Sequence, residues 1–250
     1  MKKTTQSIQY LTKSEYGIMF TKTYIAVRTK ERRVLTDEQV QQLPYVSPDN
    51  PNFNEWRIRK RSANRFLKYL SHKKNIHRIL EIGCGNGWFS NLIANKFPSI
   101  SVIGLDINDF ELEQANNTFQ RENLTFVYGD IFELNSNVFE HEFDFVVFNA
   151  SIQYFNDFDK VISKVKSFLK PNGEIHIIDS PFYNERNIIT AKQRTFDYYN
   201  KLGFPEMAKN YFHHRIDNVV DFEVLYHPKK IGLSRIFKGI DSPFMWLKSK

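Results

Sequence analysis

A loop of three glycines beside an acidic residue has the clearest chemical meaning in this sequence. The segment Glu81-Ile82-Gly83-Cys84-Gly85-Asn86-Gly87 lies between a short apolar run and a stretch with helical spacing. Glycine lets a ligand approach the backbone closely, and the unpaired N–H groups at the start of a helix favour an anion. The spacing G-x-G-x-G departs from the G-x-G-x-x-G of dinucleotide-binding loops, because Trp88 takes the place of the third glycine. The loop still suits a carboxylate, which is smaller than a pyrophosphate.

From residue 76 onward, apolar runs alternate with amphipathic stretches. We expect strands at 77–82, 101–106, 124–130, 143–150 and 173–179, and helices at 87–97, 109–120 and 158–170. Lys170-Pro171-Asn172-Gly173 is expected to stop the last of these helices before the fifth strand. Strands that are apolar almost throughout are typical of sheets covered by helices on both faces. The alternation predicts an α/β fold of βαβ units around a doubly wound, mainly parallel sheet.

The flanking segments predict fewer elements. Three prolines between residues 44 and 51 indicate a connector, after which a helix is expected from its N-cap, Asn54, to about Ser71. Another helix is expected over about 185–202. The segments 221–227 and 242–248 are expected to close the sheet as a late, antiparallel strand pair.

The motif E-x-G-x-G-x-G after the first strand resembles motif I of class I S-adenosylmethionine-dependent methyltransferases. The resemblance covers roughly residues 55–180, because four further elements follow in the order of that family. They are Asp106 at the end of the second strand, Asp130 after the third, the fourth strand at 143–149, and the turn Leu169-Lys170-Pro171-Asn172-Gly173-Glu174. The resemblance implies a Rossmann-like fold and S-adenosylmethionine as the cofactor.

The resemblance also implies a division of the chain and a set of cofactor-binding residues. Residues 54–250 would form the methyltransferase domain, and residues 1–53 an N-terminal helical extension that is a candidate lid. The implied cofactor-binding residues are Glu81, Gly83, Gly85, Gly87, Asp106, Ile107, Asp130, Ile131 and Asn149. In this assignment Asp106 accepts hydrogen bonds from the ribose hydroxyls, Asp130 accepts from the adenine amino group, and Asn149 lies near the reacting methyl.

Each assignment has a plain structural alternative. Asp106 is then an ordinary residue at a strand end, and Asp130 a turn residue, since Gly-Asp is common in turns. Glu81 is then a structural acid that faces a helix, and Asn149 caps the next turn. Cys84 is expected to fill space in the loop rather than to act as a nucleophile.

The acceptor is less well defined than the cofactor. Asn149-Ala150-Ser151-Ile152 departs from the N/D-P-P-Y/F motif of many enzymes that methylate amino groups of nucleic acids. A hydroxyl acceptor usually needs a base, for which the catalytic candidates are Tyr154 and the pair His213 and His214. Structural hydrogen bonding is the alternative for the histidines. Residues 181–215 are expected to form part of the acceptor pocket, with ordinary helix packing as the alternative.

Composition restricts the classes of function. The chain has 250 residues, a net charge of +7 and one cysteine, which excludes an internal disulfide framework and a multi-cysteine zinc site. We expect no metal, and a reducing, cytoplasmic setting is the simplest interpretation. No apolar run has the length of a membrane span. Residues 1–78 hold 17 Lys and Arg against 6 Asp and Glu, which raises the question of an anionic partner. The basic face of the helix at 54–71 consists of Arg57, Arg59, Lys60, Arg61 and Lys68.

The sequence therefore predicts an enzyme that transfers a methyl group from S-adenosylmethionine to a small-molecule acceptor, with oxygen as the favoured atom, by in-line displacement. An RNA or nucleotide methyltransferase and a catalytically silent cofactor-binding scaffold are the alternatives. A nicotinamide-dependent oxidoreductase is disfavoured by Trp88 and the glycine spacing. The segment 242–248 mixes apolar and basic residues, so membrane contact is the alternative to an edge strand there. The oligomeric state stays open.

Overall fold

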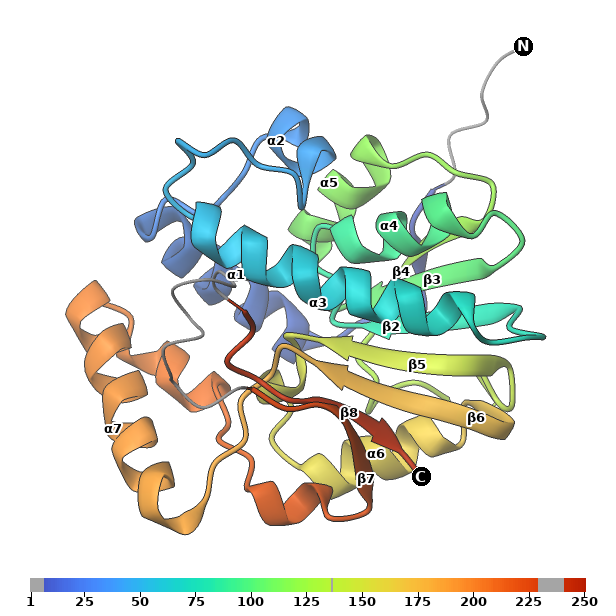
Figure 1. Cartoon of the computed structure of the whole chain (residues 1–250). Coiled ribbons are helices and arrows are strands. Elements are labelled where there is room, and N and C mark those ends of the chain that lie inside the picture. The colour runs from blue at the N-terminus through green and yellow to red at the C-terminus, as the bar shows by residue number, and fades with distance from the viewer. Residues whose placement is uncertain (1–6, 136, 229–240) are drawn as a thin grey trace.

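One sheet forms the centre of the molecule. The computed structural model describes residues 7–135, 137–228 and 241–250. The strands are β1 (Gln9–Tyr10), β2 (Arg78–Ile82), β3 (Ser101–Asp106), β4 (Leu124–Tyr128), β5 (Phe143–Asn149), β6 (Leu169–Ile178), β7 (Phe222–Tyr226) and β8 (Trp246–Ser249). Their order is β1-β4-β3-β2-β5-β6-β8-β7 (Figure 1). Strands β1 to β6 pair in parallel, and β8 lies antiparallel between β6 and β7. The predicted mainly parallel sheet with an antiparallel C-terminal pair is confirmed.

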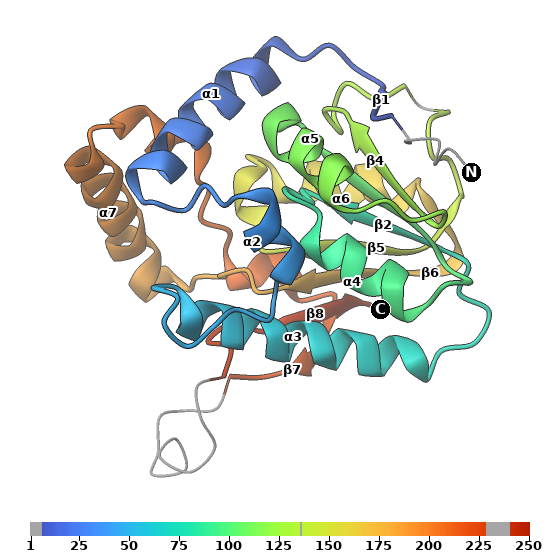
Figure 2. The same cartoon turned by 90° about the horizontal axis from the view of Figure 1, so that it is seen from above.

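Helices cover both faces of this sheet, as the doubly wound prediction requires. They are α1 (Glu15–Lys30), α2 (Asp37–Gln42), α3 (Phe53–Ser71), α4 (Trp88–Lys96), α5 (Asp109–Thr118), α6 (Phe158–Lys166) and α7 (Glu185–Leu202), with 3-10 turns η1 (Ile152–Tyr154), η2 (Pro205–Asn210) and η3 (Ile216–Val219). Helices α3, α4 and α5 share one hydrophobic core, and α6 lies in the other (Figures 1 and 2). Ile79 and Leu80 of β2 contact opposite cores, because successive residues of a strand point to opposite faces.

The start of α3 differs from the prediction. The helix begins at Phe53, its N-cap is Asn52, and no side chain caps it, so Asn54 lies inside the first turn and the prediction of Asn54 as the cap is wrong. The backbone turns earlier than the sequence pattern suggests, since the Phe53 N–H donates to the Asn50 carbonyl at 2.9 Å. The predicted end at Ser71 is confirmed.

The region around Pro171 also differs from the prediction. Helix α6 ends at Lys166, and Leu169 already begins β6, so the helix predicted as far as residue 170 is too long. The pairing of β5 with β6 shifts register between Phe143 and Phe145, which makes room for the Pro-Asn-Gly segment inside the strand. Proline and glycine are tolerated in strands at such irregularities.

The N-terminal residues join the sheet and cross its edge. Strand β1 pairs in parallel with β4, which places Tyr10 opposite Tyr128. Helix α1 then contacts α7 and η2 through a separate apolar cluster of Phe20, Val27, Tyr199 and Met207. Figure 2 shows α1 between α7 and β1, on the side of the molecule away from α3. The segment before residue 54 is therefore built into the fold at both β1 and α1.

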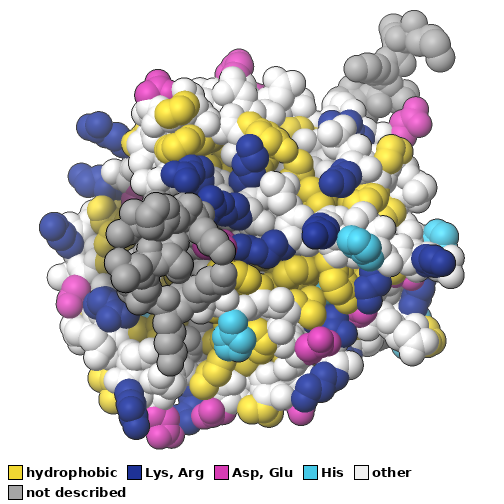
Figure 3. Space-filling view, viewed as in Figure 1, with side chains coloured by type: hydrophobic (Ala, Val, Ile, Leu, Met, Phe, Trp, Pro, Cys, Tyr) yellow, Lys and Arg dark blue, Asp and Glu magenta, His cyan; other side chains and the backbone are white. Residues whose placement is uncertain are grey.

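Basic side chains gather over α3 on the face shown in Figure 3. Several of them lie on aromatic rings, with the Lys60 Nζ 4.1 Å from the centre of the Tyr45 ring and the Arg65 guanidinium carbon 3.9 Å from that of Tyr226. These stems cover apolar surface while the charges stay at the protein surface. Within the described ranges, no helix has both the length and the apolar character of a membrane span.

Candidate functional site

A cavity of about 720 Å³ opens at the carboxyl ends of the central parallel strands. Its volume falls in the range of small-molecule sites, roughly 300–1,000 Å³. Eight of the nine predicted cofactor-binding residues line it: Glu81, Gly83, Gly85, Asp106, Ile107, Asp130, Ile131 and Asn149. The sheet therefore brings together residues that are up to 68 positions apart in the chain (from Glu81 to Asn149).

The glycine loop adopts a backbone that other residues rarely accept. Gly83 has a φ of 72°, and a Cβ added there would lie 2.5 Å from the Cβ of Ser151. Gly87 also has a φ of 72°, but its added Cβ would meet the Phe126 ring at 2.5 Å. Gly87 does not line the cavity. Its place is the N-cap of α4, where the absence of a side chain lets the helix pack closely on β4.

Glu81 is buried beneath the loop, with 1% of its surface exposed. The Ser90 hydroxyl of α4 donates to its carboxyl group. Burial raises the pKa of Glu81 to about 8, an effect that the Ser90 hydrogen bond opposes and the neighbouring Asp106 carboxyl reinforces. Glu81 thus links the loop to α4 and brings a carboxyl group of unusually high pKa to the cavity.

Asp106 ties the glycine loop to the start of α5. Its Oδ2 accepts from the Gly85 N–H at 2.7 Å, and its Oδ1 accepts from the Asn108 N–H at 2.9 Å. Burial raises the pKa of Asp106, although these backbone donors lower it. A carboxylate oxygen has two lone pairs, so both oxygens keep the capacity to accept from a ligand hydroxyl.

Glu111 is a cavity residue that the sequence analysis missed. It lies in the first turn of α5, where its Oε2 accepts from Asn108 Nδ2 at 3.0 Å. Burial, and then the charge of Asp106, raise the pKa of Glu111 to about 7. The signal in the sequence was the N-x-x-E spacing of a helix start, Asn108 to Glu111.

Asp130 is held by the N-terminal segment. Its Oδ2 accepts from the Ser14 hydroxyl at 3.1 Å, and its backbone N–H donates to Thr12 Oγ1 at 2.9 Å. Thr21 of α1 reaches the same side of the cavity and donates to the Ile107 carbonyl at 3.1 Å. Helix α1 is thus attached beside two of the predicted cofactor-binding residues, Asp130 and Ile107.

Asp179 follows β6 and was also missed. Its φ of 51° is unusual for a residue other than glycine, and burial raises the pKa of its carboxyl group. Oδ1 accepts from the hydroxyls of Ser62 and Ser242 at 2.7 and 2.8 Å, whereas Oδ2 has no hydrogen-bond partner within the described ranges. Strained backbone and unsatisfied polar atoms cluster at functional sites. The position directly after the fifth predicted strand was the available signal.

The catalytic candidates divide into two groups. Tyr154 lines the cavity, and its hydroxyl accepts from Arg28 at 3.2 Å. His213 pairs with Thr195 Oγ1 at 3.0 Å, and the buried His214 with the Ile152 carbonyl at 3.0 Å. Neither histidine is among the cavity-lining residues. Both histidines make hydrogen bonds within the fold, as the structural alternative expected.

The expected acceptor segment, 181–215, reaches the cavity only in part. The lining residues of this segment are Pro181, Asn210, Tyr211 and Phe212, whereas Tyr183 does not line the cavity.

Cys84 lines the cavity as a buried thiol. Burial raises its pKa well above the usual value, which disfavours the nucleophilic thiolate. Within the described ranges, no cluster of three or more His, Cys, Asp or Glu is arranged to hold a metal ion.

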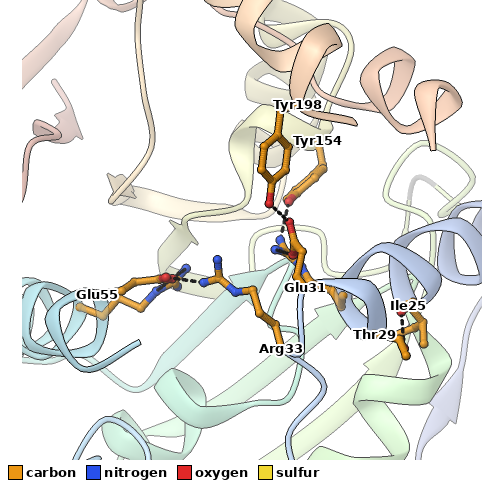
Figure 4. Close-up of polar contacts among 9 residues, drawn as sticks. Ile25, Thr29, Glu31, Arg33, Glu55, Tyr154 and Tyr198 are labelled. Carbon is orange, nitrogen blue, oxygen red and sulfur yellow. Dashed lines mark hydrogen bonds and ion pairs between the residues drawn. The ribbon is translucent and has the colours of Figure 1, made fainter. Parts of the chain in front are cut away.

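Arginines form part of the cavity wall. Arg28, Arg33 and Arg59 line the cavity from the N-terminal segment and α3. Figure 4 shows Arg33 directed at Glu55, while Glu31 meets the hydroxyl of Tyr198 from α7. Arg59 was predicted only as part of a basic helix face. The contacts of this wall join residues that are far apart in the chain.

The fold is that of a class I S-adenosylmethionine-dependent methyltransferase. Residues 73–232 match the family model described as "Methyltransferase domain". The chain therefore belongs to this methyltransferase-domain family.

Among curated proteins, the chain is 34% identical over 120 residues to a malonyl-[acyl-carrier protein] O-methyltransferase of Priestia megaterium, which covers 47% of this chain and 43% of that protein. It is 28% identical over 151 residues to a trans-aconitate 2-methyltransferase of Deinococcus radiodurans, covering 59% and 56%. The alignments thus span about half the length of these relatives.

A solved structure shares the fold across most of the chain. It is an O-methyltransferase family protein from Burkholderia thailandensis, with a TM-score of 0.51, 14% identity, and coverage of 96% of this chain and 73% of that one. A phosphoethanolamine N-methyltransferase from Haemonchus contortus also has a TM-score of 0.51, at 22% identity, with coverage of 79% and 46%. At these identities the likeness shows the fold alone.

Proposed function

We propose that this protein transfers the methyl group of S-adenosylmethionine to an oxygen atom of a small-molecule acceptor. One observation carries the proposal: the glycine loop and the carboxyl groups of Asp106 and Asp130 face the same cavity as Tyr154 and a wall of arginines. The cavity has one half suited to the cofactor and a second half of different chemistry. Two relatives with oxygen or carboxylic-acid methylation in their names support the choice of acceptor atom.

The residues of the first half fit a cationic nucleoside. In addition to burial, the charge of Asp106 raises the pKa values of Glu81 and Glu111. All three carboxyl groups raise the pKa of the Cys84 thiol. A ligand with ammonium and sulfonium charges would relieve this repulsion. Asp106 would accept from the ribose hydroxyls through the oxygens that already hold Gly85 and Asn108. Asp130 would accept from the adenine amino group.

The chemistry asked of the protein is mainly orientation. The bound cofactor supplies a methyl group made electrophilic by its sulfonium. Ile107 and Ile131 would hold the adenine between apolar surfaces, and Asn149 would align the methionine end at the edge of β5. Correct alignment of the acceptor with the S–CH₃ bond contributes up to about 7–11 kcal/mol in favourable cases. Exclusion of water from the cavity protects the cofactor from hydrolysis.

We propose that the segment 1–53 acts as the wall and lid of this site, and that residues 54–250 form the methyltransferase domain. The support is the chain of contacts along α1, from Ser14 on Asp130, through Thr21 on the Ile107 carbonyl, to Arg28 on Tyr154. With one cysteine, the protein suits a reducing, cytoplasmic setting.

Calorimetric titration tests the cofactor. We expect S-adenosylmethionine and S-adenosylhomocysteine to bind and NADH not to bind. Asp106→Ala should weaken both sulfur ligands, whereas Asp109→Ala, on the exposed start of α5, should leave their affinity unchanged. Binding of NADH alone would refute the proposed methyl transfer. Cofactor binding without methyl transfer to any acceptor would favour the silent scaffold.

The basic surface over α3 favours one second candidate, methylation of RNA or a nucleotide. Such binding falls steeply with salt, because it releases counterions from the phosphates. A gel-shift series with a short RNA at rising salt tests this candidate. Transfer of a tritiated methyl group to the RNA would select it over the small-molecule acceptor.

A further inference from the structure

The cavity divides into an acidic and a basic half. The acidic half contains Glu81, Asp106 and Asp130 from the carboxyl-end side of the strands, and Glu111 from the first turn of α5. The basic half contains Arg28, Arg33 and Arg59, which share the carboxylates of Glu31 and Glu55. These two carboxylates balance two of the three guanidinium charges, and the arginine charges also reach Glu111 and Asp179, whose pKa values burial raises. A site whose walls carry opposite charges suits two ligands of opposite charge, side by side.

Arg28 is the best placed of these cations. Its Nη1 donates to Glu31 Oε2 at 2.8 Å and its Nη2 donates to the Tyr154 hydroxyl at 3.2 Å. The guanidinium carbon also lies 4.7 Å from the centre of the Tyr24 ring. A guanidinium carries five N–H donors, which is more than Glu31, Tyr154 and a side-chain hydrogen bond with Tyr24 engage. Held on three sides, Arg28 is pre-organised to bind a further anion.

The position of Arg28 relates it to the methyl group rather than to the adenine. Tyr154 belongs to η1, which follows β5 after only two residues. The end of β5 is Asn149, the residue expected beside the methionine part of the cofactor. The adenine side lies near Asp130, where α1 begins, whereas Arg28 lies at the other end of that helix. An anion bound by Arg28 would therefore lie toward the reacting end.

Two further arginines, Arg33 and Arg59, add positive charge beside Arg28. Glu55 accepts from Arg59 Nε at 3.0 Å and also pairs with Arg33 (Figure 4). One carboxylate is thus shared by two guanidinium groups, both of which line the cavity. Charge-assisted, two-pronged binding by arginine suits carboxylates in particular, because their planar geometries match.

We propose, on the basis of the proposed methyl transfer, that the acceptor is a carboxylic acid and that Arg28 binds the carboxylate that becomes methylated. One oxygen of that group accepts from the guanidinium, and the other attacks the methyl carbon. A C–O bond forms as the S–CH₃ bond breaks, and the electron pair of that bond passes to sulfur. The products are a neutral methyl ester and a neutral thioether. No proton is moved, which agrees with the location of His213 and His214 outside the lining.

The experiment uses S-adenosylmethionine with a tritiated methyl group and a panel of acceptors. The panel contains free malonate and trans-aconitate, malonyl-N-acetylcysteamine as a thioester half-acid, and the amide analogue of each. We expect label in at least one acid and in none of the amides. Mild alkali should release this label as volatile methanol, as it does for methyl esters. The free acids and the thioester distinguish a free metabolite from a carrier-bound acyl group.

The role of Arg28 is tested by substitution. Arg28→Met should raise KM for the acid roughly 10- to 100-fold, the loss of a charge-assisted hydrogen bond, with no change in affinity for S-adenosylhomocysteine. Arg28→Lys should recover part of the loss. The matched control is Lys30→Met on the same helix, an exposed residue that does not line the cavity, and its KM should stay unchanged.

Arg28→Met leaves Glu31 without this ion pair, which can lower stability on its own. The double variant Arg28→Met with Glu31→Gln should therefore show the same rise in KM with an intact melting transition. Three outcomes would overturn the proposal. The label could be stable to alkali, or KM could be unchanged in Arg28→Met. The third outcome is that no acid binds to the protein loaded with S-adenosylhomocysteine and none is methylated by the protein loaded with S-adenosylmethionine. Failure to bind S-adenosylhomocysteine would instead refute the proposed function itself.

Discussion

Burial of the Glu81 carboxyl group makes the stability of the fold depend on pH. Its pKa in the folded protein is about 8, above the usual 4.5, so the folded state favours the protonated form. Its contribution to stability is therefore fully present below pH 4.5 and is lost as the pH rises toward 8. A difference of one between the folded and unfolded pKa values corresponds to about 1.4 kcal/mol.

We predict that Glu81→Gln becomes more stable relative to the wild type as the pH rises from 5 to 8, by a few times ~1.4 kcal/mol at most. Urea denaturation of both proteins at several pH values measures this difference. Comparison of the two proteins removes the contributions of the other titrating groups. A difference that stays constant with pH would show that the Glu81 carboxyl ionises in the folded state as it does in water.

At the scale of single residues, Gly87 also allows a sharp comparison. An alanine there would adopt a left-handed backbone and meet the Phe126 ring, whereas Gly203, with a φ of 88°, has open space around its added Cβ. We expect Gly203→Ala to lose about 1–2 kcal/mol of unfolding free energy through backbone strain alone. Gly87→Ala should lose a further ~1–3 kcal/mol through overpacking. Equal losses in the two variants, measured by urea denaturation, would contradict the close contact of α4 with β4.

At the scale of elements, the contact of α1 with the site can be tested by removing one hydrogen bond. Thr21→Val keeps the side-chain shape and removes the bond to the Ile107 carbonyl. A hydrogen bond of this kind contributes about 0.5–1.5 kcal/mol, so Kd for S-adenosylhomocysteine should rise roughly 2- to 12-fold. Thr29→Val is the matched control, because its hydroxyl donates to Ile25 within the same helix (Figure 4). An equal effect of both would argue against α1 as a wall of the site.

At the scale of the whole molecule, the cavity couples ligand binding to global unfolding. Its lining runs from Tyr16 to Phe244, nearly the full length of the chain. A ligand at 100 times its Kd stabilises the folded state by about 2.7 kcal/mol. We therefore expect S-adenosylhomocysteine to raise Tm in a single cooperative transition, and Asp106→Ala to remove the increase. A biphasic melt would show that the N-terminal segment unfolds separately.

Most of the fold was predictable because it depends on local patterns. Each parallel strand after residue 76 is a short apolar run, and each crossover helix has an apolar stripe, so both periods are visible in the sequence. Helix α7 was predicted with the bounds that it has, Glu185–Leu202. Strand β1 was not predictable, since it has two residues and depends on the edge of β4 for its pairing. Asn54 failed as a cap because turn residues repeat through 50–54, and only tertiary contacts select one.

The cofactor half of the site was predictable for a different reason from the acceptor half. Glycine spacing and acids at strand ends are set by the backbone topology, which the sequence pattern already determines. Arg28 meets Tyr154 across 126 residues, and Glu31 meets Tyr198 across 167, and no local spacing encodes such pairs. His213 and His214 have suitable chemistry, but the chain after α7 turns their side chains toward Thr195 and Ile152.

The hydrogen bonds of the Ser14 hydroxyl bear on which step limits the rate of turnover. It accepts from the Gly17 N–H, which caps α1, and it donates to Asp130, which is expected to hold the adenine. Arrival or departure of the nucleoside therefore exchanges partners at the same carboxyl group that anchors the helix. We expect the spent thioether to leave only as the first turn of α1 loosens, so a step of release, slower in viscous solvent, rather than bond making would set the pace of the catalytic cycle.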